Sequence, residues 1–261
     1  MDTIFRFKET PKREASAKIQ VAGTENKKVQ NTGMKKAGNG GAKKAPKKRV
    51  ESGLNLKNAQ KINKNFMYKD LKRSHCYDCD FSESNFDFTS FRGAHFKSCN
   101  FYGASFKAAE FVGTNLKKSR FKKARFEDVI FEGVNLDGAD FAGAIFRNTI
   151  FVGTDVSKAK NLNAISVNIK VYETLPELEM SEELKSAVDE AMMNQYVKAS
   201  RVLDTKEGKI NTLSIMRLLE QFDEKTLIKG FKLMKNKIAN DFCTLSYLIK
   251  FLAKHEAEGL I

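Results

Sequence analysis

Large apolar residues recur at every fifth position from Leu71 to Val156, and Cys76 is the one small exception. Thirteen of the 21 Phe of the chain stand in this series. Two positions before these residues the chain carries small ones, such as Ala94 and Ala104. A period of five fits neither the 3.6-residue period of a helix nor the two-residue period of a flat strand. The repeat therefore has to be interpreted as one structural unit.

The stretches 94–96, 114–116 and 139–141 read Ala-His-Phe, Thr-Asn-Leu and Ala-Asp-Phe. They resemble the A-(D/N)-L-X-X unit of the pentapeptide-repeat family, and eighteen units follow one another in a single frame. Four units make one square turn in that family. The resemblance therefore implies a mainly β fold, a right-handed quadrilateral β-helix of about 4.5 coils, in which hydrogen bonds join neighbouring coils. The central apolar residue and the small residue point inward, and the other three positions face water.

A coil of twenty residues places residue i beside residue i+20, so the sequence predicts neighbours. Cys79 and Cys99 should be stacked inside the coil, and His75 and His95 outside it. The string 75–79 is similar to half a zinc knuckle, but a zinc site needs two further ligands. Because its two cysteines occupy inward positions of the repeat, we expect packing and no bound metal. Four cysteines without a signal peptide also favour free thiols and a cytoplasmic location.

Positive charge is concentrated at the N-terminal end of the chain. Residues 1–50 hold 14 Lys and Arg against 4 Asp and Glu and few apolar side chains, which is typical of a disordered tail. The segment Ile4 to Phe7 in this tail is either a short docking motif or a sticky segment without a partner. The sequence predicts five regions: a basic tail (1–50), a cap on the coil (51–66), the repeats (67–160), a closing strand with a linker (161–176) and a helical domain (177–261).

Beyond Pro176 the apolar period becomes helical. Ser181 and Asp223 are suited to cap helices, since their side-chain oxygens accept from backbone amides of the first turn. We expect helices from Ser181 to about Val202, over 212–222, over 224–239 and over 244–258, forming a small all-α domain. The turn 205–208 resembles a calcium loop only superficially, because Lys206 stands where a carboxylate is needed.

The last predicted helix carries a second, shorter resemblance. Tyr247, Phe251 and His255 follow the spacing of the Y-x-x-x-I-x-x-x-W motif of replication-initiation DnaD-type domains, with Phe and His in place of Ile and Trp. This resemblance covers about forty residues and implies DNA binding. An amphipathic helix with an ordinary core face gives the same spacing.

The sequence shows no catalytic constellation. Its three histidines, His75, His95 and His255, are not accompanied by a Ser or Cys in a readable nucleophile motif. The carboxylates of the repeats are expected on a flat, solvated wall where nothing perturbs their pKa. We therefore expect a protein that is not an enzyme, uses no cofactor and does not span a membrane.

The strongest functional signal is six cations within residues 117–125. The twenty-residue map pairs Lys117 with Asp137, Arg120 with Asp140 and Lys107 with Glu127. Four other cations have no acidic neighbour on the next coil. Together with the tail they favour a polyanion such as nucleic acid, through release of its counterions. The predicted polyanion-binding residues are Lys97, Lys118, Lys122, Lys123 and Arg125 of the coil and Lys43, Lys44, Lys47, Lys48 and Arg49 of the tail.

The sequence thus predicts a bacterial or phage binding scaffold that associates with nucleic acid or another polyanion. The alternative is a protein-interaction module whose partner is a topoisomerase or a replication protein. Some pentapeptide-repeat proteins bind gyrase by imitating DNA, which implies an acidic surface. The basic belt of this chain has the opposite charge.

Overall fold

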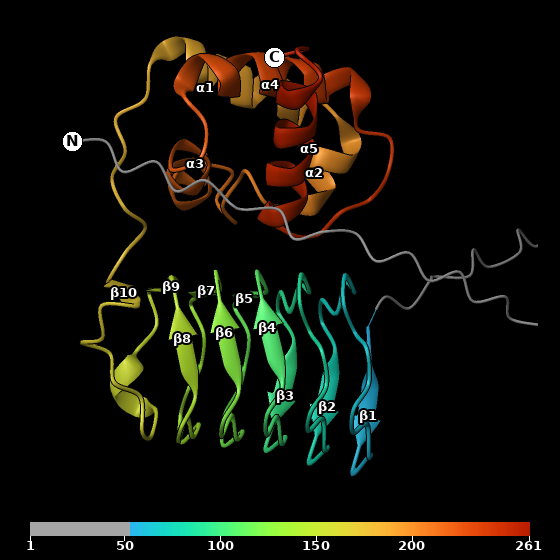
Figure 1. The fold of residues 1–261 in the computed structure, drawn as a ribbon, viewed down its shortest axis with the longest axis vertical. Coiled ribbons are helices and arrows are strands. Elements are labelled where there is room, and N and C mark those ends of the chain that lie inside the picture. Colours follow the sequence, from blue (N-terminus) through green and yellow to red (C-terminus); the bar gives the residue numbers. More distant parts are fainter. Residues whose placement is uncertain (1–52) are drawn as a thin grey trace, which may run out of the picture. The chain divides into compact units, whose positions relative to one another are not determined.

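The computed structural model describes residues 53–261, which form a β-helical column and a helical region (Figure 1). Three parallel sheets line the column. The first contains β1 (Asn55–Lys57), β2 (His75–Tyr77) and β3 (His95–Lys97), and the second β4 (Ser105–Lys107), β6 (Arg125–Glu127) and β8 (Ile145–Arg147). The third contains, in spatial order, β10 (Ile169–Tyr172), β9 (Thr149–Val152), β7 (Ile130–Glu132) and β5 (Glu110–Val112). Isolated bridges such as Asn100 with Arg120 connect the coils along the fourth side.

Every one of these pairings joins residues twenty apart, as between Phe106 and Phe126. This register confirms the quadrilateral β-helix predicted from the repeat. The column has about 6 turns, more than the 4.5 expected, because β1 already pairs with β2 in coil register. Lys61 stands at an inward position of this first turn, where it interrupts the five-residue series of apolar residues.

The core of the column is a set of stacked phenylalanine rings. Phe106 is completely buried and lies parallel to Phe86 and Phe126, with ring centroids 5.3 and 5.0 Å apart. Rings on adjoining sides of a coil meet at steeper angles, as between Phe101 and Phe106 at 65°. Offset and edge-to-face contacts of this kind add to the stabilisation that burial provides. Cys76, Cys79 and Cys99 are buried in the same core as free thiols, so their predicted inward placement is confirmed.

After β9 the short 3-10 helix η1 (Val156–Lys158) and a loop lead to β10, which pairs in parallel with β9. The sequence predicted a closing strand with a linker over 161–176, and β10 lies in this range. Ile165 and Val167 are 95% and 97% exposed and lie in the loop before β10.

The helical region consists of α1 (Glu182–Met192), α2 (Gln195–Ser200), α3 (Thr212–Leu219), α4 (Glu224–Lys237) and α5 (Leu245–Ala257). The predicted caps are confirmed, since Ser181 accepts from the Leu184 amide and Asp223 from the Thr226 amide. The first expected helix is divided into two, because the Asn194 side chain accepts from the amides that start α2. None of the helices in 53–261 is long and apolar enough to cross a membrane.

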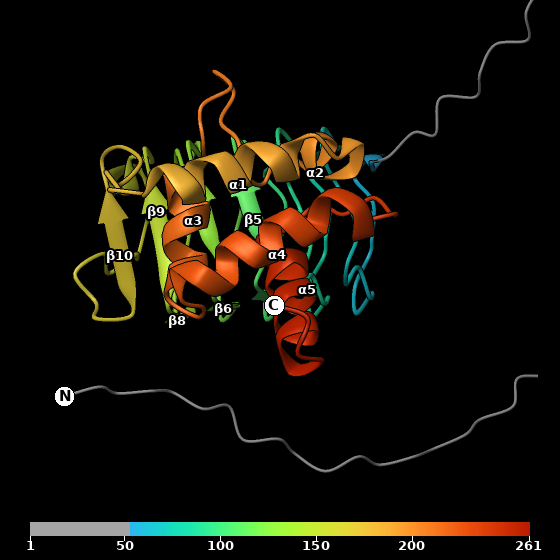
Figure 2. The same ribbon diagram turned by 90° about the horizontal axis from the view of Figure 1, so that it is seen from above.

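One side of the column is covered by these helices. Ile130, Ile150 and Val152 point outward from the sheet β5–β7–β9–β10, yet they are buried in the same apolar cluster as Leu184, Leu218 and other helical residues. Figure 2 shows α1 and α4 side by side above the strands. We call this side the docked face.

Candidate functional site

The docked face and α5 are joined by a buried carboxylate. Glu110 of β5 is 6% exposed, and its Oε1 accepts from the Leu245 amide at 2.5 Å. Leu245 begins α5, and the preceding Thr244 makes no side-chain capping bond to the helix. A residue of the column therefore caps a helix of the other region, where the free backbone amides favour a negative charge.

Burial raises the pKa of Glu110 to about 7, although the Leu245 amide and the charge of Arg92 act against this rise. The ordinary value is 4.5. The folded protein therefore holds this proton more tightly than the unfolded chain, and its stability should fall as the pH rises from about 4.5 to about 7. Glu132 of the same face adds to the rise.

Glu110→Gln should raise the melting temperature at about pH 8 and change it little at about pH 5, because it keeps the acceptor oxygen but removes the buried charge. Thermal unfolding at both pH values measures the difference. Glu83→Gln, on an exposed glutamate of the column, is the control and should leave the melting temperature unchanged at both. An equal gain from Glu110→Gln at the two pH values would contradict this explanation.

Two further contacts attach the helical region to corners of the coil. Arg217 of α3 is 6% exposed, and its guanidinium donates to the Asn148 side chain at 3.2 Å and lies 3.4 Å from Asp128. Lys250 of α5 donates to the Tyr68 hydroxyl at 2.9 Å, and its Nζ lies 4.1 Å from the centre of the Phe88 ring. Sequence reasoning missed these residues.

The predicted basic belt lies on the other sides of the column. Lys117 and Lys118 follow the central Leu116 of the side that contains β3, and Arg120 to Lys123 belong to the bridged side. Arg125 begins β6. We define the belt as Lys117, Lys118, Arg120, Lys122, Lys123 and Arg125.

Two belt residues form salt bridges, one as expected and one not. Lys117 pairs with Asp137 at 2.6 Å, as the twenty-residue map predicted. Asp140, however, pairs with Lys122 at 3.4 Å rather than with Arg120, so the prediction that Lys122 is unpaired is wrong. The belt residues that make no salt bridge within 53–261 are Lys118, Arg120, Lys123 and Arg125, and all four are exposed.

The carboxylates next to the belt are firmly ionised. The hydrogen bond and charge of Lys117 lower the pKa of Asp137. Burial alone would raise the pKa of Asp140, but hydrogen bonds from Asn161 and the Ala142 amide, together with Lys122, lower it. Both acids therefore carry their negative charge near neutral pH.

Lys118 and Lys123 occupy special backbone positions. Their φ angles are 59° and 56°, in the left-handed region where a side chain is disfavoured relative to glycine. On the next coil the corresponding residues are Gly138 and Gly143, where an added Cβ would lie 3.6 Å from the lysine Cγ. A Cβ at either glycine would thus make ordinary van der Waals contact with the aliphatic part of the lysine, and the glycines stand there because of their own positive φ.

The remaining predicted site residues are more scattered. Lys97 of β3 lies one coil below the belt, with its Nζ 5.8 Å from the centre of the Tyr77 ring. His75 and His95 are stacked outside the column as predicted, with ring centroids 5.0 Å apart. No group of three metal-binding side chains occurs within 53–261. Lys43, Lys44, Lys47, Lys48 and Arg49, and the segment 4–7, lie outside the described residues.

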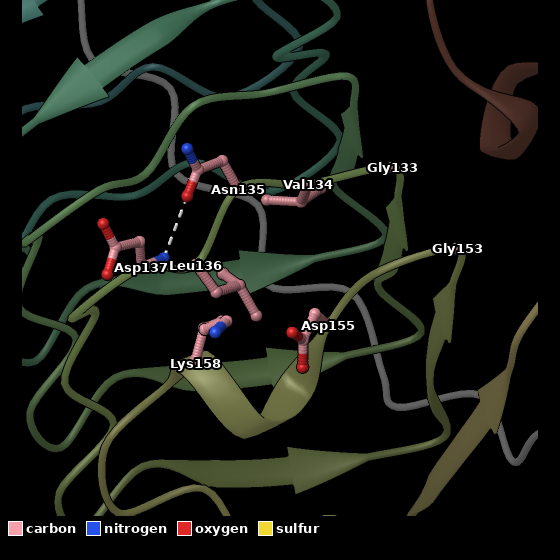
Figure 3. A pocket seen from close by; sticks show the side chains of 8 residues that line it. All are labelled: Gly133, Val134, Asn135, Leu136, Asp137, Gly153, Asp155 and Lys158. Carbon is pink, nitrogen blue, oxygen red and sulfur yellow. Dashed lines mark hydrogen bonds between the residues drawn. The ribbon is translucent and has the colours of Figure 1, made fainter.

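A hollow of about 560 Å³ lies at the corner beside β9 and η1, and its lining includes Asn135, Asp137, Asp155 and Lys158 (Figure 3). Two of its polar side chains accept local hydrogen bonds: Asn135 accepts from the Asp137 amide at 2.9 Å, and Asp155 accepts from the Ser157 amide at 3.1 Å. The residues that line it include no histidine, cysteine or serine. The hollow therefore holds no nucleophile with an adjacent base.

The stacked coils define a β-solenoid repeat protein. Family models described as pentapeptide repeats match residues 74–111 and 96–160. Residues 74–160 of this chain therefore consist of pentapeptide repeats. Both matches leave out the helical region, so the resemblance of Tyr247, Phe251 and His255 to a DnaD-type domain is unsupported.

Solved structures with the same repeat are similar to this chain at low identity. HetL, a pentapeptide-repeat protein involved in regulating heterocyst differentiation in Nostoc sp. strain PCC 7120, is 20% identical, with a TM-score of 0.24 over 48% of this chain. The match covers only 52% of HetL. A pentapeptide-repeat protein of the Arabidopsis thaliana thylakoid lumen is also 20% identical, covering 59% of this chain and 79% of that one at a TM-score of 0.25.

Full-length QnrB1, a plasmid-mediated fluoroquinolone resistance protein, is 17% identical, with a TM-score of 0.20 over 53% of this chain and 89% of its own length. A search of curated proteins gave no significant match.

Proposed function

We propose that this protein is a non-enzymatic binding scaffold whose basic belt takes a polyanionic partner, in the first place nucleic acid. The observation that carries the proposal is the set of four exposed cations, Lys118, Arg120, Lys123 and Arg125, that make no salt bridge within the described residues. Lys118, Arg120 and Lys123 lie on two sides of the column that carry none of the described docking contacts. Arg125 begins the next side, whose far corner at Asp128 contacts Arg217. Because a rigid column holds these charges at fixed spacing, binding requires little ordering of the belt itself.

The belt should act with the basic tail, whose net charge over residues 1–50 is +10 from 14 cations and 4 acids. Each phosphate that a protein neutralises lowers the slope of log affinity against log salt by about 0.9. Contacts of this kind carry no sequence information, so we expect binding to duplex DNA without sequence preference.

Changing Lys118, Arg120, Lys123 and Arg125 to Gln should flatten the salt slope for duplex DNA by up to about 3.6 units, or 0.9 for each lost phosphate contact. Fluorescence anisotropy titrations of the full chain at several salt concentrations measure this slope. The control changes Lys225, Lys229, Lys232 and Lys237 to Gln. These lysines of α4 are equally exposed and also lie outside the described salt bridges.

A second variant separates binding from stability. The double change of Lys118→Gly and Lys123→Gly removes two belt charges. It also places glycine at two positions where the backbone is left-handed, so it should weaken DNA binding without destabilising the column. DNA binding that is absent at low salt, or that responds equally to the belt and α4 changes, would contradict a role for the belt.

An acidic protein surface is the second candidate partner, because carboxylates would pair with the same four cations. This proposal includes gyrase or another topoisomerase as a protein target. Capture of such a partner by the full chain, lost in the belt variant while DNA binding is absent, favours this alternative.

A further inference from the structure

A cleft of about 660 Å³ lies between the docked face and the helical region. The column contributes Asp70, Lys72, Arg73, Ser90, Arg92, Gly93 and Val112, and the helical region contributes Ala199, Ser200, Arg201, Lys206, Phe242 and Cys243. This volume lies within the range of about 300–1,000 Å³ that small-molecule sites occupy. The cleft is distinct from the belt.

The lining is strongly basic, with five cationic side chains and one carboxylate, Asp70. Two of the five are bound locally: Lys72 pairs with Asp70 at 2.7 Å, and Arg201 pairs with Asp204 at 2.8 Å. Among the described residues the other three, Arg73, Arg92 and Lys206, make no salt bridge. The lining of the cleft therefore carries an excess of positive charge.

Arg92 reaches from the column toward the helical region. One terminal nitrogen of its guanidinium donates to the Arg201 carbonyl at 3.1 Å, whereas its Nε is buried without a hydrogen-bond partner in the described structure. Buried donors are nearly always satisfied in folded proteins. Glu110 and Glu132 lie on the same face, where burial raises the pKa of both and the charge of Arg92 acts against that rise.

The cleft also has an apolar part. Val112 of β5 and Phe242 line it, and the Phe242 ring is stacked on Tyr247 with centroids 4.6 Å apart, which fixes its orientation. Gly93 lies beside Arg73, since an added Cβ would be 3.8 Å from the arginine Cγ. An anionic group next to a fixed aromatic ring matches a ligand with a charged end and an apolar body.

We propose that this cleft binds a small organic phosphate, with Arg73, Arg92 and Lys206 contacting the phosphate and Phe242 contacting the organic part. A phosphate suits the site because its oxygens accept several charge-assisted hydrogen bonds at once from arginine and lysine side chains. Binding would also link the column to the helical region, because both contribute to the lining.

Isothermal titration calorimetry of the full chain with AMP, inorganic phosphate and adenosine tests the proposal. AMP should bind at one site, phosphate more weakly, and adenosine not at all. Arg73→Gln and Lys206→Gln should each weaken AMP binding roughly tenfold, as expected for the loss of one hydrogen bond to a charged group. Neither side chain makes a described salt bridge, so the fold should be unaffected. Lys209→Gln, which changes a lysine outside the lining on the same turn, is the control.

Retention of AMP binding by the four-residue belt variant would show that the cleft acts independently of the belt. The absence of both phosphate and AMP binding at millimolar concentration would overturn the proposal. Equal binding of adenosine and AMP, or AMP binding that Arg73→Gln and Lys206→Gln leave unchanged, would do the same.

Discussion

Phe106→Ala should lower the free energy of unfolding by about 3–5 kcal/mol, because it leaves a cavity in a tightly packed stack. Phe106 is completely buried between Phe86 and Phe126, whose rings lie parallel to it above and below. The rings of Phe101 and Phe111 on the same coil are close as well, at 5.7 and 5.5 Å. Backbone hydrogen bonds hold the neighbouring coils in register, so the gap cannot close easily.

Urea unfolding of the variant and the parent measures this loss. Ile145→Ala is the control, because Ile145 is an outward residue of β8 and is 52% exposed. It should cost less than about 1 kcal/mol, as surface substitutions do. Comparable losses at the two positions would show that the inward register is wrong.

Ile150→Asp should release the helical region from the column. Ile150 is 1% exposed within the apolar cluster that joins the docked face to the helices. A carboxylate buried there without a partner costs about 4 kcal/mol, equivalent to a rise of about three units in its pKa. The column itself should persist, since each coil is stabilised mainly by its neighbours.

Limited proteolysis in the segment 173–180 should reveal this release as faster cleavage, while the circular dichroism of the strands is retained. Ile145→Asp introduces the same charge one repeat earlier, at an outward position that the helices do not cover. It should leave the cleavage rate unchanged. Equal cleavage rates for the two variants would refute the assignment of Ile150 to the interface.

The fold of the column could be predicted because each coil packs only against its neighbours, so a short repeat in the sequence determines it. Each coil repeats the same inward residues, so the period of five fixed the register of Phe106 and Cys99 before any long-range contact was known. The first turn was missed because Lys61 replaces an inward apolar residue, and a lysine with an aliphatic stem is tolerated near an open end. The helix caps at Ser181 and Asp223 were predictable for the same local reason.

The docked face was not predicted, although the sequence carried a signal for it. Val112, Ile130, Ile150 and Val152 occupy outward positions of one side, where the other sides carry mostly polar residues. Apolar residues at the outward positions of a solenoid indicate a covered face. Phe88 also stands at an outward position of the repeat, and Lys250 of α5 lies over its ring.

The belt was predicted in outline, but one of its ion pairs was assigned to the wrong residue. The twenty-residue map places Arg120 beside Asp140. The Asp140 side chain, however, accepts from the Ala142 amide at 3.0 Å and from Asn161 at 2.8 Å. These bonds turn the Asp140 carboxylate toward Ala142, and the Lys122 side chain of the previous coil reaches it there. The backbone register, which pairs residues twenty apart, does not by itself determine side-chain contacts between residues at other spacings.

The attachments at Lys250 and Arg217 constrain how this protein can evolve. Solenoids readily gain or lose whole coils, because duplication of twenty residues preserves every backbone pairing. Here α5 is attached at Tyr68 and Phe88 and α3 at Asp128 and Asn148, several coils further along. A coil inserted between these two attachment points would move them about 4.8 Å further apart. The helices could then keep only one of the two attachments. The contacts of the helical region therefore disfavour any change in the number of coils between these two attachment points.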